Sequence, residues 1–475
     1  MALVIGLTMA LANLLQEKVG VNDGLGWDGL IYGGWARDFT NLLWQHPPDS
    51  YYVQRLLPSA LAHAALVAIG RNPNTITSAD IVHCFEVMNI FMLTCGAWIW
   101  SHVAQVLSVS KSGRWLGAVA LFGGFAILKW SVYYPVLGDV WGLTLGLGML
   151  FSQLTSRWIL LLVLGLVGAT CWPTVLPVAL LLLILPARCP PRLSRRVARP
   201  QPWAWILALT AALGWLIWTL WLDPSKIAGL NESEPRTSEV FRASCIGVFA
   251  FLALALGPLI QALHISSWPH RIQLRWLLVK GFLAVGLLLG ATVIHGTFSS
   301  GQSGIGAVAQ LHTTAYFATT KPLVFLVGHG VFFGPIFLVL LLRWRSIVGR
   351  VSAEGLGLVA VAGLGLFLSL GSESRHLFTF AGMLLPFAIV ELDRSNLGHK
   401  TALIFVSISL VYSRFWLTLP THPGGNPLKF PAQMFFMTQG PWMSWSMYLA
   451  QGALVVITAI WVHRLFKQEG FTALE

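Results

Sequence analysis

Charged residues are scarce in this chain, at 10% of 475 residues, whereas soluble globular proteins carry about 25%. A water-facing surface cannot be built from so few, so lipid must cover much of the molecule. Acidic residues are scarcer than basic ones, 18 compared with 30, which gives a net charge of +12. The basic residues lie in short tracts between apolar runs, which is typical of membrane topology. We therefore expect a membrane protein without a nucleic-acid partner.

Cysteine is scarce as well, and its five residues form neither a CxxC pair nor a Cys/His ligand pattern. This spacing gives no sign of a disulfide framework or a metal site. The chain also lacks a cleavable signal peptide with a basic first region and a Walker A phosphate-binding sequence. Its first apolar run, residues 2–15, is short for a span of about 20 residues. We expect a short first helix or the remnant of a longer natural start.

Long apolar runs are abundant, because 56% of the residues are hydrophobic. They predict an all-α polytopic membrane protein with about 11–14 transmembrane helices. A further run, 51–70, opens with Tyr-Tyr-Val-Gln-Arg and predicts a helix lying at the membrane surface. The predicted spans lie near residues 1–15, 79–107, 115–133, 139–155, 157–170, 173–186, 203–221, 240–264, 275–295, 322–343, 355–371, 376–391, 401–418 and 442–463.

The distribution of basic residues predicts the orientation. If alternate loops are assigned to the cytoplasm from the N-terminus onward, those loops hold 17 of the 30 basic residues and five of the 18 acidic ones. The largest basic group is the cluster Arg188–Arg199, and Arg271 and Arg275 lie in a later cytoplasmic loop. The positive-inside rule then predicts an integral protein of a bacterial inner membrane or an ER-type membrane, with both termini cytoplasmic.

Residues 1–475 read as a single transmembrane domain, since no convincing internal repeat is present. Within it, residues 16–78 form the first outer loop and are expected to carry amphipathic helices. Two further outer segments, 296–321 and 419–441, are also long. The first is the longest and is rich in Trp and Tyr, so it is not a disordered tether. Long loops in a compact protein are usually functional.

Ionisable residues concentrate at the outer ends of the predicted helices. A charge inside a span is costly and normally faces a cavity or a partner. Each candidate also has a structural explanation: Asp28 as a turn residue, Asp139 as a helix N-cap, Lys129 reaching to the surface, His329 as a hydrogen-bonded core residue, and Arg375 as an interfacial anchor. The candidates are Asp28, Asp38, Arg55, Lys129, Asp139, His329, Glu373, Arg375 and His376.

The order of these parts resembles a known family. Asp28-Gly29-Leu30-Ile31-Tyr32 follows the first span, Tyr51 to Gly70 resembles a surface helix, and Asp139 begins the fourth span. Thr170-Cys171-Trp172-Pro173-Thr174 is similar to a Thr-Lys-Pro break without its lysine, and Glu373-Ser374-Arg375-His376 precedes an apolar run containing Pro386. In this order the chain resembles the GT-C glycosyltransferases, which include the protein O-mannosyltransferases, the lipid A aminoarabinose transferases and the GPI mannosyltransferases. The resemblance covers chiefly residues 1–186 and 355–391. Within the domain, 79–186 is then the GT-C-like helical module and 187–475 a variable helical module.

The resemblance implies transfer of a sugar from a polyprenyl-phosphate-type carrier to an acceptor glycan, lipid or protein on the outer or lumenal face. Such transfer needs a carboxylate to take the acceptor proton and cations to hold the leaving phosphate. Asp28 would be the base, with Asp38 or Asp139 assisting. The donor phosphate would meet Arg375, Arg55, Lys129 and His376, and Tyr32, Glu373 and His329 are further site candidates. No cofactor is certain, and the sequence leaves open whether a divalent metal assists.

Two other functions remain open. One is a transporter or flippase of a lipid-linked or anionic substrate, which intramembrane Lys129 and His329 and a helix broken at Pro173 or Pro335 would suit. The other is a non-catalytic subunit of a membrane complex. The position of the main cavity distinguishes a glycosyltransferase from a transporter. A GT-C-like enzyme predicts a cavity at the outer boundary, lined by Asp28 and Arg375, whereas a transporter predicts one near the middle of the membrane.

Overall fold

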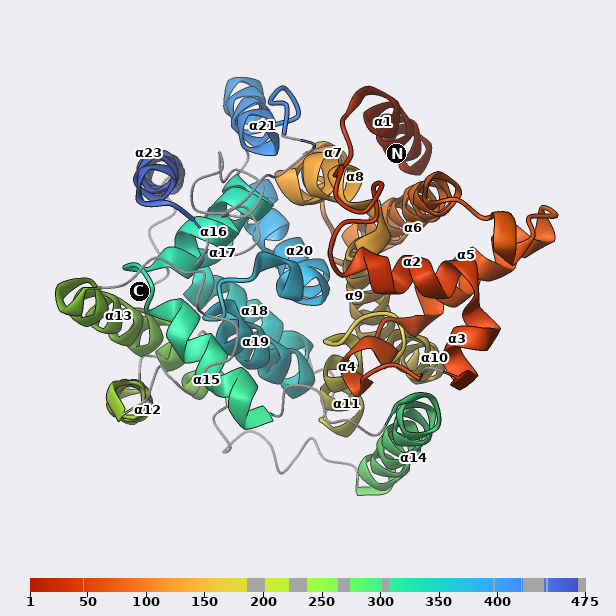
Figure 1. Cartoon of the computed structure of the whole chain (residues 1–475). Coiled ribbons are helices and arrows are strands. Elements are labelled where there is room, and N and C mark those ends of the chain that lie inside the picture. Colours follow the sequence, from red (N-terminus) through yellow and green to blue (C-terminus); the bar gives the residue numbers. More distant parts are fainter. Residues whose placement is uncertain are drawn as a thin grey trace.

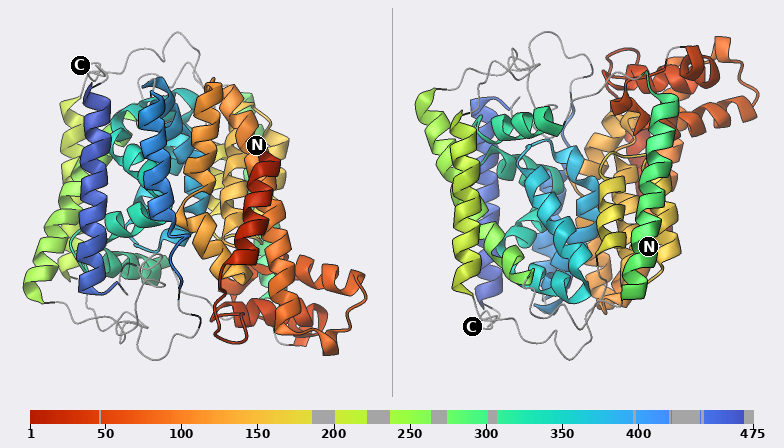
Figure 2. Two further views of the ribbon diagram at one scale, coloured as in Figure 1. Left: turned by 90° about the horizontal axis from the view of Figure 1, so that it is seen from above. Right: turned by 90° about the horizontal axis from the view of Figure 1, so that it is seen from below.

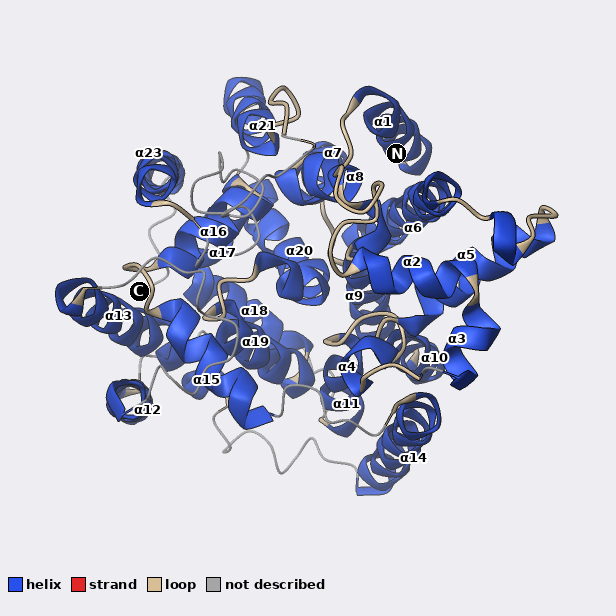
Figure 3. Ribbon diagram, in the orientation of Figure 1, coloured by secondary structure: helices blue, strands red, loops and turns tan. Residues whose placement is uncertain are grey.

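The computed structural model describes residues 1–45, 47–185, 201–221, 237–263, 274–300, 307–395, 398–419, 421, 440 and 443–468. These residues form helices joined by turns, and no strand occurs among them (Figure 3). Six helical stretches are long and apolar enough to cross a membrane, and a bent pair brings the number to seven. The prediction of an all-α, polytopic membrane protein is confirmed at this level. The long helices are α6 (Ser78–Val106), α12 (Pro202–Trp221), α13 (Ser238–Ala262), α14 (Leu274–Phe298), α20 (Phe378–Arg394) and α23 (Trp445–Gln468).

Most of the other predicted spans appear as shorter apolar helices of 10–17 residues. The total of about 11–14 membrane crossings therefore stays a prediction, because several of these helices are shorter than the ~20 residues of a typical span. They are α1 (Ala2–Leu15), α9 (Val140–Leu154), α10 (Trp158–Gly168), α11 (Val175–Ile184), α16 (Val324–Phe333), α19 (Leu356–Ser369) and α21 (His399–Ser413). A further short helix, α15 (Ala307–Ala318), precedes α16.

Two spans that the sequence predicts as continuous are broken. The stretch 115–133 divides into α7 (Lys111–Phe122), a π-helical turn η2 (Ala126–Trp130) and α8 (Ser131–Tyr133), with a bend of 49°. The stretch 322–343 divides at Gly334, whose φ of 76° separates α16 from α17 (Pro335–Leu342). Pro335 has no N–H to donate into a continuous helix, and glycine adopts a positive φ without steric cost. Both breaks lie among buried residues.

The segment 16–78 lies across one end of the helical bundle, where its helices run roughly at right angles to the others (Figure 2). It contains α2 (Gly29–Arg37), α3 (Phe39–Gln45), α4 (Ser50–Val53), α5 (Leu56–Ala68) and the 3₁₀ turn η1 (Pro73–Thr75). The helix predicted over 51–70 appears as α4 and α5, with Gln54 and Arg55 between them. Its place at a membrane surface stays a prediction.

The core of the bundle surrounds α20, which packs against α7, α9 and α17 (Figure 1). The apolar window of α20 is 89% buried, whereas those of α14 and α23 are only 17% buried. Helices α12, α13, α14, α21 and α23 stand at the rim in Figure 1. Their exposed Leu, Ile and Val side chains form the surface that lipid would cover.

The end opposite α2–α5 collects basic residues into ion pairs. Glu391 of α20 is buried and pairs with Arg343 and with Arg350 of α18 (Trp344–Glu354). Asp393 accepts hydrogen bonds from the backbone and hydroxyl of Ser110, just before α7. This arrangement fits the predicted inner face, although the compartment stays a prediction. The cluster Arg188–Arg199 and Arg271 lie outside the described residues.

Candidate functional site

Asp28 is held at the start of α2 by contacts between the first outer segment and the third predicted span. Val19 N–H donates to the carbonyl of Tyr133 at 2.9 Å, and Gly29 N–H donates to the hydroxyl of Tyr134 at 3.0 Å. Gly26 makes this approach possible, because its φ is 70° and a Cβ there would overlap the ring of Tyr134. The loop therefore places Asp28 at the end of the bundle where α2–α5 lie.

Asp28 pairs with Arg375, which lies 347 positions later in the chain. Both terminal nitrogens of Arg375 lie 3.4 Å from Asp28 Oδ2, and Arg375 Nε donates to Glu373 Oε1 at 2.5 Å. Arg375 stands in η6 (Ser374–Leu377), the turn between α19 and α20. Burial opposes a charge on Glu373, but its neighbours His376 and Arg375 lower the pKa of the Glu373 carboxyl to about 2. Arg375 is therefore bound between two carboxylates and is not a simple interfacial anchor.

Arg55 is the second cation of this group. Its Nη1 donates to the hydroxyl of Tyr32 at 2.9 Å and lies 4.0 Å from Asp28 Oδ2. The guanidinium carbon lies 4.6 Å from the ring centroid of Trp172 and 5.1 Å from that of Tyr51. The Arg55 side chain is 2% exposed, yet its Nε and Nη2 have no hydrogen-bond partner among the described residues. Arg55 thus offers two buried donors to an acceptor that the described residues do not supply.

Asp139 is the third carboxylate near these arginines. It is electrostatically coupled to Arg375 and Arg55, and its Oδ2 accepts from Trp130 Nε1 at 3.0 Å. Its side chain does not cap α9, and its buried Oδ1 has no partner in the described part of the chain. A helix cap therefore does not explain Asp139. We call Asp28, Arg55, Asp139, Glu373 and Arg375 the outer charged cluster.

Two sequence-predicted site residues, Asp38 and Lys129, lie away from this cluster, and a third, His329, contacts Ser374 between Glu373 and Arg375. Asp38 stands at the other end of α2, about 15 Å along the helix from Asp28, and accepts from Asn41. Lys129 is 1% exposed and pairs with Glu17 at 2.7 Å, so it neither joins the cluster nor reaches to the surface. His329 is a core residue, because its ring nitrogens bond Ser374 Oγ at 2.9 Å and the carbonyl of Ser369 at 2.7 Å.

His376 remains at the edge of the outer charged cluster. Its Nδ1 lies 3.6 Å from Glu373 Oε2, and its ring faces that of Trp172 at 6.4 Å. Among the described residues, no group of three His, Cys, Asp or Glu side chains is arranged to hold a metal ion. The cluster instead alternates carboxylates and guanidiniums, and that arrangement suits an oxyanion placed beside a proton acceptor.

Sequence reasoning missed the aromatic walls of the site. Trp172 lies in the break between α10 and α11, and the backbone N–H of Leu57 donates to the carbonyl of Thr170 in the same break at 2.9 Å. Trp130 and Tyr134 hold Asp139 and Gly29. The Thr170–Thr174 motif and the Tyr133-Tyr134 pair were visible in the sequence. Their contacts join segments far apart along the chain, so sequence spacing could not reveal them.

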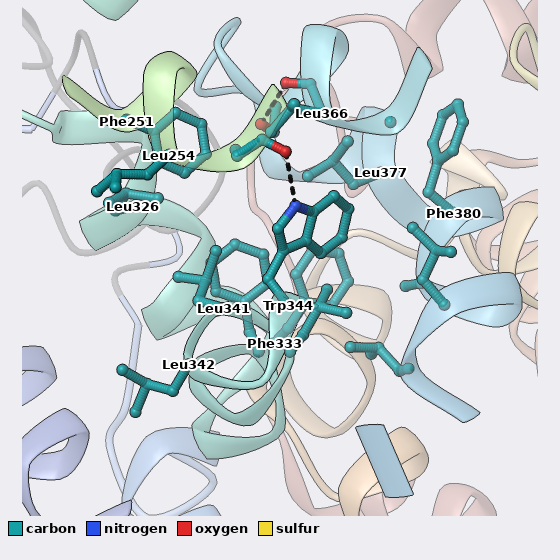
Figure 4. Close-up of a pocket in the computed structure, with 18 residues that line it drawn as sticks. Phe251, Leu254, Leu326, Phe333, Leu341, Leu342, Trp344, Leu366, Leu377 and Phe380 are labelled. Carbon is teal, nitrogen blue, oxygen red and sulfur yellow. Dashed lines mark hydrogen bonds between the residues drawn. The ribbon is translucent and has the colours of Figure 1, made fainter. Parts of the chain in front are cut away.

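An apolar cavity of about 350 Å³ lies beside the cluster within the helical bundle (Figure 4). Neither Asp28 nor Arg375 lines it, so the cavity predicted around those residues is not the one described here. It extends from Leu377, in the same turn as Arg375, to Trp344, whose Nε1 donates to the carbonyl of Ala255 at 2.9 Å. Its position is closer to that predicted for a transporter, but no charged side chain lines it for an anionic cargo.

Comparison with known proteins adds no relative to these observations. No protein-family model matches the chain, and neither a curated protein nor a solved structure matches it.

Proposed function

We propose that this protein is a GT-C-type membrane glycosyltransferase that moves a sugar from a polyprenyl-phosphate-type lipid to an acceptor at the end of the membrane where α2–α5 lie. The observation that carries the proposal is the meeting of Asp28 with Arg375 and Arg55, at 3.4 Å and 4.0 Å. A transferase of this kind needs a base next to cations that stabilise the leaving phosphate. The outer charged cluster supplies both at one place.

Asp28 is the best-placed of the three carboxylates for the base. Its side chain is 32% exposed, compared with 15% for that of Glu373, while Asp139 is 3% exposed. Both arginine contacts go to Asp28 Oδ2, and no hydrogen bond between described residues uses Oδ1. Oδ1 is thus the oxygen that would accept the proton of an incoming hydroxyl.

The reaction would be a substitution at the anomeric carbon. The acceptor oxygen forms the new bond to that carbon, the bond from the carbon to the phosphate oxygen breaks, and the acceptor proton passes to Asp28. The phosphate leaves on its lipid, and the guanidiniums of Arg375 and Arg55 stabilise the charge that develops on it. The ring of Tyr51 packs over the Arg55 guanidinium, 5.1 Å from its central carbon, and borders the place where the phosphate would bind.

The apolar cavity supports a lipid-linked donor. Leu377 belongs to its lining and lies two residues after Arg375 within η6, so one turn of chain borders both a cation and an apolar space. The tail of a membrane lipid already lies in apolar surroundings, so an apolar space inside the bundle accepts it without a desolvation cost. A phosphate at Arg375 could therefore be anchored by a tail that enters between α13, α17, α19 and α20.

The alternative function is a flippase or transporter of a lipid-linked substrate, which the depth of the same cavity favours. That protein would move labelled polyprenyl phosphate between the leaflets of proteoliposomes and would make no glycosidic bond. Transfer of a sugar by purified protein in detergent, where leaflets do not exist, separates the two functions.

The decisive experiment is the substitution Asp28→Asn, assayed for sugar transfer from a polyprenyl-phosphate sugar. Asparagine keeps the shape but cannot take the proton, so turnover should fall by about 10²–10⁴, or roughly 3–5 kcal/mol of barrier. The matched control is Asp49→Asn in the same outer segment, since Asp49 caps α4 and asparagine caps equally well. If Asp28→Asn turned over at the wild-type rate, Asp28 would be only a turn residue. Loss confined to Asp139→Asn would move the base there.

A further inference from the structure

A second polar group lies around the turn that follows α19, next in the chain to the outer charged cluster. Its basic member is Lys321, which directly precedes Pro322 and α16 and is only 2% exposed. The Lys321 ammonium lies 5.4 Å from the ring centroid of Trp445, at the start of α23. Neither sequence analysis nor the outer charged cluster uses this lysine.

Two buried hydroxyls, on segments that pack against α16, have no hydrogen-bond partner among the described residues. Ser372 is 0% exposed and Thr314 is 2% exposed, and neither Ser372 Oγ nor Thr314 Oγ1 has a hydrogen-bond partner among the described residues. Leaving such a group unpaired typically costs about 1–3 kcal/mol. Two of them in one place indicate that something else is meant to bond them.

Several contacts bring these three residues together. Gly440 N–H donates to the carbonyl of Ser372 at 3.2 Å, and a Cβ on Gly440 would lie 3.0 Å from both Ser372 Cβ and Val324 Cγ2. Val324 N–H in turn donates to the carbonyl of Lys321 at 3.2 Å. Thr314 Oγ1 lies 3.7 Å from the position that a Cβ on Gly371 would take. The start of α16, the end of α15 and the turn after α19 therefore share one small region.

The backbone of this region is strained. Leu323 and Ser372 each have a φ of 51°, a left-handed conformation that costs a non-glycine residue roughly 1–2 kcal/mol. Strain of this kind persists where the surrounding structure holds it, and it clusters at ligand sites. Here one strained residue, Leu323, follows Lys321 by two positions, and the other is Ser372 itself.

The stretches that contribute Lys321, Thr314 and Trp445 carry no acidic residue, whereas Glu373 directly follows Ser372 and pairs with Arg375. No Asp or Glu occurs in the sequence between Glu239 and Glu354, or between Asp393 and Glu469, and these two stretches contain α15, α16 and α23. The first turn of α16 adds the positive end of its helix dipole beside Lys321. An ammonium, two hydroxyl donors and a helix N-terminus form a set that suits phosphate oxygens.

We infer that Lys321, Ser372 and Thr314 form a second binding site, which takes a phosphate group of the second substrate. This assignment to a substrate rests on the proposed glycosyltransferase function. Residues 372–375 join the second site to Arg375, and three residues span at most about 11 Å, so both sites would fit one bound donor and one bound acceptor. The acceptor would then be a phosphate-bearing lipid or glycan, and not a neutral one. Trp445 covers the ammonium and would have to turn outward for binding.

The test measures binding of two soluble probes to the purified chain in detergent. Farnesyl phosphate serves as the probe for the first site and, at saturation, keeps that site occupied. Dihexanoyl phosphatidic acid is then titrated, with dihexanoyl phosphatidylcholine as the probe without a free phosphate. The wild type should bind the phosphatidic acid under these conditions and should bind it more tightly than the phosphatidylcholine.

Lys321→Gln should weaken binding of the phosphatidic acid by roughly 10- to 150-fold and leave binding of farnesyl phosphate unchanged. The matched control Lys400→Gln, an exposed lysine of α21, should change neither. Thr314→Val provides a second variant that removes an unpaired hydroxyl without changing shape. It should bind the phosphatidic acid several-fold more weakly, while its ligand-free melting temperature stays equal or rises.

Equal phosphatidic acid binding by wild type and both variants would overturn the inference. Weaker farnesyl phosphate binding by Lys321→Gln would also overturn it, because Lys321 would then belong to the donor site. If the proposed function were wrong and the second site correct, the results would differ. Sugar transfer by Asp28→Asn would be normal, and binding of the phosphatidic acid would still depend on Lys321.

Discussion

The two unpaired donors of Arg55 lead to a prediction in which stability and binding move in opposite directions. Arg55→Met replaces the guanidinium with an apolar side chain of similar length. It removes one hydrogen bond, to the Tyr32 hydroxyl at 2.9 Å, and a 4.0 Å contact with Asp28. It also removes the buried and unpaired Nε and Nη2.

The magnitudes follow from these contacts. Two unpaired buried donors cost the ligand-free protein about 2–6 kcal/mol, and a hydrogen bond involving a charged group contributes about 1.5–3 kcal/mol. When Arg55→Met removes both the unpaired donors and the hydrogen bond, the stability of the ligand-free protein should stay unchanged or rise slightly. A bound phosphate would accept from both donors. Loss of the Arg55 guanidinium should therefore weaken phosphate binding by about 3–6 kcal/mol, or two to four orders of magnitude.

The assay compares thermal unfolding of the ligand-free protein with the affinity for farnesyl phosphate. The matched control is Arg37→Met in the same outer segment, because Arg37 Nε donates to the carbonyl of Ile76 at 3.1 Å and its Nη2 donates to Ser78 Oγ at 3.4 Å. Arg37→Met should lose stability and keep its affinity. If Arg55→Met melted well below wild type and still bound farnesyl phosphate normally, Arg55 would be a structural residue and the reasoning would be refuted.

Three further predictions concern topology, a buried ion pair and acid stability. In a variant without the native cysteines, an impermeant thiol reagent added from outside should label Asn74→Cys but not Ser112→Cys; the reverse pattern would place the site in the other compartment. Lys129→Met should destabilise the fold by about 3–5 kcal/mol, because it removes the cation that pairs with Glu17, and should not alter farnesyl phosphate affinity; a loss of affinity would return Lys129 to the site. The folded-state pKa of Glu373 is lowered from 4.5 to about 2, so its contribution to stability is present above pH 4.5 and is lost as the pH falls toward 2. Glu373→Gln should therefore melt with a flatter pH dependence across that range, and an unchanged slope would contradict the ion pair.

Several features of the protein follow from its sequence because they depend on local composition. Twenty or so apolar residues in a row favour a membrane-spanning helix wherever they occur, so the positions of α6, α12, α13, α20 and α23 were predictable. Pro335 offered a local signal for the break between α16 and α17, since a proline cannot donate into a helix, although the span 322–343 was predicted as continuous. The placement of Asp28 and Arg375 beyond the ends of apolar helices also followed, from where the apolar runs end, while the side of the membrane that they face stays a prediction.

Only the tertiary structure decided which of these charged residues meet. Asp28 and Arg375 are 347 positions apart, and their pairing depends on the loop held by Tyr134 and on the turn after α19. The same packing separates Asp38 and Lys129 from the outer charged cluster and leaves Arg55 with two donors unpaired. Hydropathy reports how deep a residue lies in the membrane, but not its position around the bundle. That position is set by how helices distant in the sequence pack against one another, and it determines which side chains can act together.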